Sequence, residues 1–307
     1  MKKLLIFLGL LLFFLPSFGQ VSSYSFTQST STYTEITGGT QLGNESTNDQ
    51  RFVDPAALVG GTILTGTGFP IGFDFVFNGH TYDRFGVNPN GWIALGKSTA
   101  TPSVDLVSTS SYTPLSSVQT LFNEVLKSRI SAFSRDLSAQ VGSTLRFEVI
   151  GTAPNRTLVV QWKNYRKNFA TGDSYNFQIR LNETLNTIDL VYGSCVNNAT
   201  STTFQVGLRA APSNVATNFV NRVSATSWLT SNGGILANEV MAATDANMPT
   251  SGLTFTYTPP TCPSPTNYFS SNITNTSATI NWETISSASS GYEYVVSTSN
   301  VLPTGAG

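Results

Sequence analysis

Charged side chains are scarce in this 307-residue chain: Asp, Glu, Lys and Arg together make up 11% of it, against a usual share of about 25%. The 16 basic and 17 acidic residues give a formal net charge of −1. Because there is no basic field to attract phosphates, we expect neither nucleic acids nor anionic membrane surfaces as partners. Ser, Thr, Asn and Gly take the place of the charges, and these residue types favour strands and turns.

Histidine is nearly absent, which limits the chemistry open to the chain. His80, the only histidine, follows Asn78 and Gly79 in a predicted turn, a place that suits exposed surface better than a catalytic triad. No G-x-S-x-G nucleophile elbow accompanies it, and one His with two distant Cys does not make a zinc site. We predict no catalytic residue, no cofactor and no metal, and hence that the chain is not an enzyme.

Carboxylates leave one further route to hydrolysis, because a pair of acids suffices for it. The acids available in the strand-rich region are dispersed over polar strand positions and turns: Asp74, Asp136, Glu148, Asp173, Glu183 and Asp189. We interpret them as solvated surface.

A phosphate-binding motif occurs on paper, since Gly91 to Ser98 satisfies G-x-x-x-x-G-K-S. The phosphate loop requires a helix that begins at the lysine. Here the middle of the motif, Trp92 to Leu95, has the pattern of a buried strand, and the residues after Ser98 do not have that of a helix. We therefore reject a nucleotide site.

Cysteine is limited to Cys195 and Cys262. An even pair in an exported chain is compatible with one disulfide. The sequence alone leaves open whether these two residues pair or remain independent thiols.

Long apolar runs are also missing, with one exception at the N-terminus. Lys2 and Lys3 precede an apolar run from Leu4 to Leu15, and the small residues Ser17 and Gly19 follow it, before Gln20. This is the layout of a cleaved secretory signal peptide over 1–19, and the run is too short to span a bilayer. We predict a secreted, extracellular or cell-surface protein with no membrane span in the mature chain.

What the chain has in abundance is apolar alternation of period two, which indicates strands. In Phe69 to Phe77 every odd position is bulky and apolar, and Tyr175 to Leu181 repeats the pattern with Asn176, Gln178 and Arg180 predicted to face water. Turn signals separate the runs, as at Asn78-Gly79. We predict an all-β fold, a jelly-roll-like β-sandwich.

Two departures from the strand pattern affect the organisation of the chain. Residues 116–130 are the only stretch close to helical spacing, which predicts a short helix or an irregular crossover. Four prolines between Tyr257 and Pro265 exclude sheet pairing. We therefore divide the chain into a sandwich over 20–258, a Pro-rich linker over 259–265, and a last segment over 266–307.

The last segment resembles the start of a fibronectin type III domain, an immunoglobulin-like sandwich. A Pro-rich lead is followed by a strand pattern ending in Trp282 and a Tyr-rich strand from Tyr292. The later strands of such a domain are absent, and half a sandwich would leave its core face open. We therefore expect the sequence to be a fragment of a longer polypeptide.

The larger domain resembles the N-terminal β-sandwich of surface proteins from type IX-secreting bacteria. The resemblance rests on Gly72 to Phe77, Phe85 to Leu95, Gly151 to Tyr165 and Phe204 to Leu208. A further similarity is to nidogen-like extracellular domains. Both resemblances imply an extracellular module of a larger multidomain protein, and neither brings catalytic residues.

The four tryptophans bear on the choice of ligand, because aromatic rings can stack on sugars. Trp92, Trp162 and Trp282 lie in strand patterns that favour the core, whereas Trp228 is the candidate for a ligand-stacking aromatic. We predict a non-catalytic binding or adhesion module with an extracellular protein, matrix or glycan partner. The alternative is a carbohydrate-binding accessory module of an extracellular hydrolase.

Overall fold

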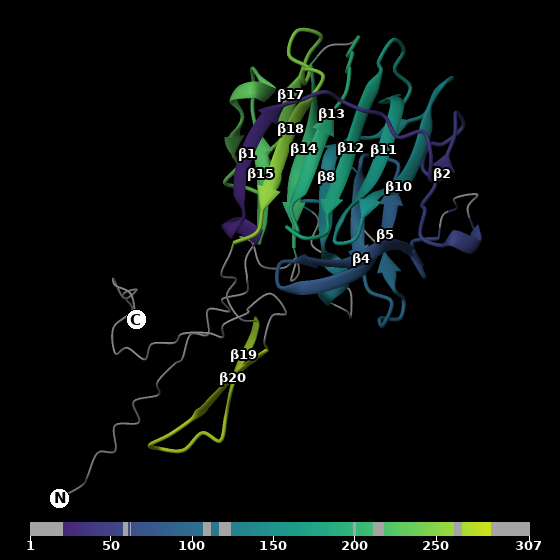
Figure 1. Ribbon diagram of the computed structural model, residues 1–307. Coiled ribbons are helices and arrows are strands. Elements are labelled where there is room, and N and C mark those ends of the chain that lie inside the picture. Colours follow the sequence, from purple (N-terminus) through teal and green to yellow (C-terminus); the bar gives the residue numbers. More distant parts are fainter. Residues whose placement is uncertain are drawn as a thin grey trace, which may run out of the picture.

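The computed structural model describes residues 21–57, 61, 63–106, 112–116, 124–198, 201–210, 218–260 and 266–283. The predicted signal peptide, Cys262 and the strand pattern from Tyr292 lie outside the described residues. The elements are strands and short 3-10 helices, which confirms the all-β prediction (Figure 1). The 3-10 helices are η1 (Val21–Ser23), η2 (Pro55–Ala57), η3 (Glu124–Lys127) and η4 (Trp228–Thr230).

Two eight-stranded antiparallel sheets make up the body of the molecule. In order across sheet I the strands are β1 (Ser25–Thr30), β18 (Leu253–Thr258), β13 (Ile188–Tyr192), β12 (Tyr175–Asn182), β11 (Asn155–Lys167), β10 (Thr144–Thr152) and β2 (Thr40–Gly43), with β9 (Leu137–Ser138) pairing β11. In order across sheet II they are β16 (Asn232–Gly233), β15 (Phe219–Val223), β14 (Thr202–Arg209), β8 (Arg129–Ser134), β6 (Trp92–Gly96), β5 (His80–Asn88) and β4 (Phe69–Phe77), with β17 (Met241–Ala243) pairing β14.

Two small ladders complete the strands: β3 (Thr65–Gly66) pairs β7 (Val104–Asp105), and β19 (Thr266–Ser271) pairs β20 (Thr279–Glu283). The β19–β20 ladder contains the strand predicted to end at Trp282. A ladder of two strands does not identify a fibronectin type III domain, so that resemblance stays a prediction.

The two sheets pack face to face through aromatic side chains, which makes the fold a β-sandwich (Figure 1). Phe133 of sheet II lies 5.2 Å, centroid to centroid, from Phe177 of sheet I, and Phe85 of sheet II lies 5.2 Å from Phe147 of sheet I. Every odd residue from Phe69 to Phe77 is buried, as the alternation predicts. Aromatic rings of this size dominate the free energy of such a core, at roughly 1.5–3 kcal/mol for each fully buried side chain.

Tight turns join the neighbouring strands where the sequence places turn residues. Asn78 and Gly79 both adopt positive φ (50° and 78°) and join β4 to β5, with Phe77 opposite His80. This is the conformation that two-residue hairpins require, and Asn and Gly tolerate it best. The predicted turn is therefore confirmed.

A strap formed by residues 31–39 crosses the outer face of sheet I, from β1 at one edge to β2 at the other (Figure 1). Its backbone bonds to two glutamines of the sheet: Ile36 N donates to Gln161 Oε1 (2.9 Å), and Gln178 Nε2 donates to Thr34 O (2.8 Å). The prediction that Gln178 faces water is therefore wrong, because the strap buries it completely. Both amide side chains are satisfied under the strap, as buried polar groups must be.

The stretch at 116–130 is not a regular helix where the structure describes it. Glu124 to Lys127 form η3, and β8 begins at Arg129. Residues 117–123 lie outside the described residues. Of the two predictions for this stretch, the irregular crossover fits the described part better.

Candidate functional site

One end of the sandwich is built from three loops, which we call the loop end: residues 139–143, 168–174 and 193–198. They lead from β9 to β10, from β11 to β12, and away from β13. Because these strands are antiparallel neighbours, the three loops gather at the same end of sheet I.

Asp173 joins the three loops of the loop end. Its backbone carbonyl accepts a hydrogen bond from Gln140 Nε2 (2.7 Å), and its carboxylate accepts one from Asn198 N (2.9 Å). Lys167 Nζ lies 3.5 Å from the carboxylate and Lys167 N donates to it at 3.3 Å. The hydroxyl of Tyr175 lies 3.0 Å away. The carboxylate therefore holds loop 168–174 against 193–198, and the backbone carbonyl of Asp173 holds it against 139–143.

The burial of Asp173 corrects the prediction that this residue is solvated surface. Its side chain is buried and its negative charge faces Lys167, the partner that a buried carboxylate requires. Burial first, and then the charge of Asp173, raise the pKa of Tyr175 well above its usual range. Tyr175 therefore stays protonated and acts as a donor to this cluster.

Each of the three loops exposes one apolar side chain: Val141, Phe169 and Val196. Phe169 is 89% exposed and adopts a left-handed conformation, with φ of 60°. For a non-glycine residue that conformation costs about 1–2 kcal/mol. The sequence reading missed Phe169, although an aromatic residue within the polar stretch 166–174 was a signal that could have revealed it.

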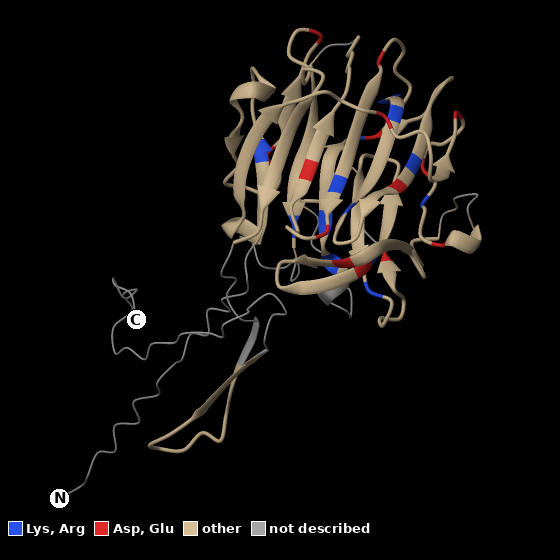
Figure 2. Cartoon of the chain, viewed as in Figure 1, with Lys and Arg blue, Asp and Glu red and all other residues tan. Residues whose placement is uncertain are grey.

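A polar hollow of about 520 Å³ lies beside Val141. Its walls include Gln140, Asn164 and Arg166. The loop end therefore offers apolar tips next to hydrogen-bonding groups, a combination that is usual in protein-binding surfaces. Charges of both signs are scattered over the sandwich without a field of one sign in the view of Figure 2.

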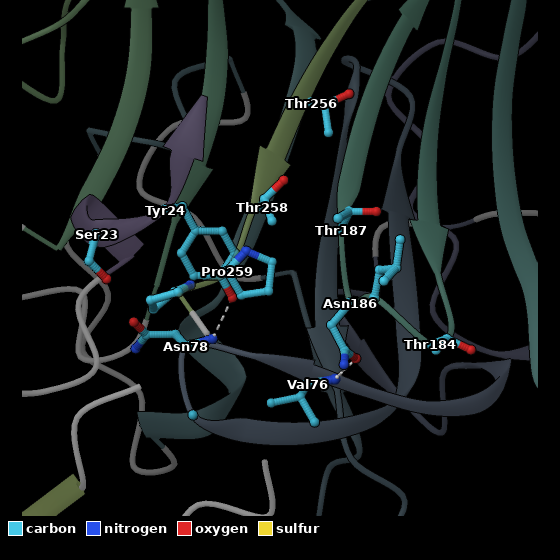
Figure 3. Close-up of a pocket in the computed structure, with 13 residues that line it drawn as sticks. Ser23, Tyr24, Val76, Asn78, Thr184, Asn186, Thr187, Thr256, Thr258 and Pro259 are labelled. Atoms are coloured by element: carbon cyan, nitrogen blue, oxygen red, sulfur yellow. Dashed lines mark hydrogen bonds between the residues drawn. The ribbon is translucent and has the colours of Figure 1, made fainter. Parts of the chain in front are cut away.

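The opposite end of the sandwich holds a cavity of about 540 Å³. It lies between the start of β1, the β4–β5 turn, the β12–β13 turn and the residues that follow β18 (Figure 3). Tyr24 and Pro259 lie on one side, Asn186 and Thr187 on the other, and Val76 between them. Of the described residues that line it, none is Asp, Glu, Lys, Arg, His or Cys.

Two hydrogen bonds hold the walls of this cavity in place. Asn78 N donates to the hydroxyl of Tyr24 (3.1 Å), and Val76 N donates to Asn186 Oδ1 (2.7 Å) (Figure 3). Burial raises the pKa of Tyr24 above its usual range, so its hydroxyl is neutral. The cavity is therefore an uncharged hollow with hydroxyl and amide groups at its walls, suited to apolar matter rather than to acid–base chemistry.

Trp228 does not lie on the surface, which corrects its interpretation as a ligand-stacking aromatic. Its side chain is 2% exposed, and its indole nitrogen donates to Ala242 O (3.1 Å). The ring packs between Phe133 and Tyr192, with centroids 5.3 and 5.1 Å away. Because the faces of the ring contact other aromatic residues, a sugar cannot stack on it. Trp92 and Trp162 are buried as predicted, while Trp282 is half-buried on β20.

The cysteine pair remains a prediction because only Cys195 is described. Cys195 Sγ donates to Asn176 O at 3.5 Å, and burial raises the pKa of its thiol to about 12. At neutral pH this thiol is therefore protonated and a poor nucleophile.

The structure supports the rejection of the phosphate loop. Trp92 to Gly96 form β6, which is buried throughout, and Ser98 N donates to Asp83 Oδ1 (2.7 Å) rather than opening a helix. His80 begins β5 directly after the turn, half-buried. Within the described ranges, no group of three or more His, Cys, Asp or Glu side chains could hold a metal ion.

Comparison with known proteins identifies the family of the chain. No curated protein and no solved structure matches the chain. A family model described as NIDO related, that is nidogen-related, matches residues 23–259, a range that includes both sheets of the sandwich. In the part of the chain that the structure describes, no helix is long and apolar enough to cross a membrane. The match agrees with the nidogen-like similarity noted in the sequence, and the chain belongs to the nidogen-related family.

Proposed function

We propose that the chain is a non-catalytic, extracellular module of the adhesion type, and that it binds its partner through the loop end. Membership of the nidogen-related family supports the extracellular, adhesive character. The predicted signal peptide over 1–19 supports export. The partner is an extracellular protein, a matrix component or a glycan.

Phe169 is the observation that carries the proposal. Its left-handed backbone costs about 1–2 kcal/mol, and leaving its ring in water forgoes roughly 1.5–3 kcal/mol of burial. Most of the other aromatic side chains that the structure describes are buried. Folding therefore gains nothing from a phenylalanine at this position, whereas a partner with an apolar recess would gain an anchor.

The surroundings of Phe169 suit such an anchor. Asp173 holds the loop that carries Phe169 against the two neighbouring loops, so little ordering entropy is lost when a partner binds. The polar hollow lined by Gln140 and Asn164 supplies hydrogen-bonding groups beside the apolar tips. Functional residues commonly lie on loops that a rigid scaffold positions in this way.

A non-catalytic role is supported by the state of Asp173, the buried carboxylate of the loop end. Its oxygens already accept from Lys167, Tyr175 and Asn198. A general acid or base must come within hydrogen-bonding distance of the proton that it transfers. The carboxylate of Asp173 already uses its oxygens for the bonds that hold the loops. The alternative of a carbohydrate-binding accessory module loses the support of Trp228, whose ring is buried.

A binding array tests the proposal. The chain from Gln20 to Gly307 is applied to immobilised extracellular matrix proteins and glycans, as wild type, as Phe169→Ser and as Leu185→Ser. Leu185 is the matched control, an exposed apolar residue at the opposite end. We expect Phe169→Ser to weaken binding at least tenfold, the effect of removing an anchor that contributes about 1.4 kcal/mol or more. Wild-type binding that survives Phe169→Ser but not Leu185→Ser would contradict the proposal.

A further inference from the structure

The polypeptide leaves the sandwich along the wall of the 540 Å³ cavity. Pro259 and Pro260, the first two residues after β18, both line it. β19 begins at Thr266, only six residues after Pro260. Six residues span at most roughly 20 Å even when fully extended, so the β19–β20 ladder cannot move far from the cavity.

The β19–β20 hairpin exposes apolar side chains among the residues that the structure describes. Phe269, Ile273 and Ile280 are 57%, 67% and 57% exposed. The two strands pair Phe269 with Asn281 and Ser270 with Ile280. A lone two-stranded hairpin is marginally stable in water and needs a further apolar surface for stability.

We propose that the cavity is an intramolecular docking site for the β19–β20 hairpin, which inserts Phe269 or Ile280 between Val76 and Leu185. The cavity lies at the other end of the sandwich from the proposed adhesion surface. The two proposals are therefore tested independently. One contact would give the uncharged cavity an apolar occupant and the exposed apolar side chains of the hairpin a surface to pack against.

Size and charge support this pairing. Pockets of about 300–1,000 Å³ enclose a molecule of drug size, and a cavity of about 540 Å³ therefore has room for one or two apolar side chains. The described lining carries no charged residue, and Glu283, at the end of β20, is the only charged residue within 266–283. No buried or like charge opposes the contact.

The tether makes the contact favourable without strong affinity. A short linker holds the two partners at an effective concentration in the millimolar range. The hydroxyls of Thr187 and Thr258 line the cavity and can satisfy backbone groups at the open edge of the hairpin. A small apolar molecule or a second copy of the chain would have neither the tether nor this continuity.

Hydrogen–deuterium exchange on the chain from Gln20 to Gly307 tests the contact. We compare wild type with Leu185→Asp, which places a charge at the cavity rim, and with Val141→Asp, a matched control at the loop end. Both side chains are largely exposed, 69% and 84%, so neither substitution disturbs the core. We expect Leu185→Asp to speed exchange in peptide 266–283 at least fivefold and Val141→Asp to leave it unchanged.

The reverse experiment must agree, because coupling between two surfaces is reciprocal. The double variant Phe269→Ser/Ile280→Ser should speed exchange in a peptide covering 184–187. Equal exchange in wild type and Leu185→Asp would overturn the proposal. Protection that falls on tenfold dilution would assign the cavity to a second copy, and a bound small molecule in native mass spectra would assign it to a ligand; either result overturns the proposal too.

Discussion

The two ends of the sandwich differ in charge and in shape. At the loop end Asp173 accepts hydrogen bonds from both neighbouring loops, from Gln140 at its backbone carbonyl and from Asn198 at its buried carboxylate. Its loop presents an exposed Phe169 in a conformation that phenylalanine disfavours. At the cavity end the described lining is uncharged, and hydrogen bonds that Tyr24 and Asn186 accept from backbone N–H groups hold the walls of the cavity in place. At the loop end a buried charge holds the loops that expose Phe169. At the other end an uncharged lining leaves a cavity that can accept an apolar group.

Removing the charge at the loop end should have the largest effect. Asp173→Ala removes the anionic partner of Lys167 and the acceptor of Asn198 N, although Asn197 Oδ1 still accepts from Lys167 and Tyr175. Breaking a buried ion pair by removing one partner costs about 3–5 kcal/mol. We expect the free energy of unfolding, measured by urea denaturation, to fall by this amount. A loss below about 1 kcal/mol would show that Asp173 does not hold the loops together.

A smaller, pH-dependent effect is expected from a carboxylate near the cavity end. Glu183 bonds to the Arg156 guanidinium and accepts from Arg156 N at 3.0 Å, and these contacts lower the pKa of Glu183 below its usual 4.5. Because the folded-state pKa is depressed, the stabilisation is complete above about pH 4.5 and is lost as the pH falls through the folded-state value. Glu183→Gln should therefore reduce the loss of stability between pH 7 and pH 3.

The check on Glu183 is a pair of urea titrations at each pH. The difference in the free energy of unfolding between wild type and Glu183→Gln should be larger at pH 7 than at pH 3. Curves that keep the same separation at both values would mean that the Arg156 contact does not set the acid sensitivity.

The smallest change in stability is expected at Phe169 itself. Asn adopts the left-handed region more readily than Phe, and an 89% exposed ring contributes almost no burial. Phe169→Asn should therefore leave the free energy of unfolding unchanged or raise it by up to about 1 kcal/mol, while binding to the partner is lost. A clear loss of stability would mean that Phe169 is part of the fold rather than of a binding surface.

The sequence predicted the parts of the fold that local pattern determines. In Phe69 to Phe77 one face is buried and the other is not, so the period of two was visible, and the Asn78-Gly79 turn followed from backbone preferences. Gln178 has the same polar character as a solvated strand residue. Its burial depends on Thr34, 144 residues away in the chain, and no local pattern encodes such a contact.

The site was predicted less well for the same physical reason. Asp173 and Trp228 both lie in turn-rich stretches whose composition indicates surface, yet Asn198 and Tyr192 cover them from other parts of the chain. Phe169 was the reverse case, since a lone aromatic between polar residues was visible in the sequence. What the sequence could not show was its exposure, which depends on how three loops meet at Asp173.

The most direct test of the account is the footprint of the bound partner. Hydrogen–deuterium exchange is measured on the chain with and without the strongest-binding matrix protein or glycan from the array. We expect slower exchange in 139–143, 168–174 and 193–198, with no change in 76–79 and 184–187. Protection confined to 76–79 and 184–187 would contradict it, because the partner would then occupy the cavity rather than the loop end.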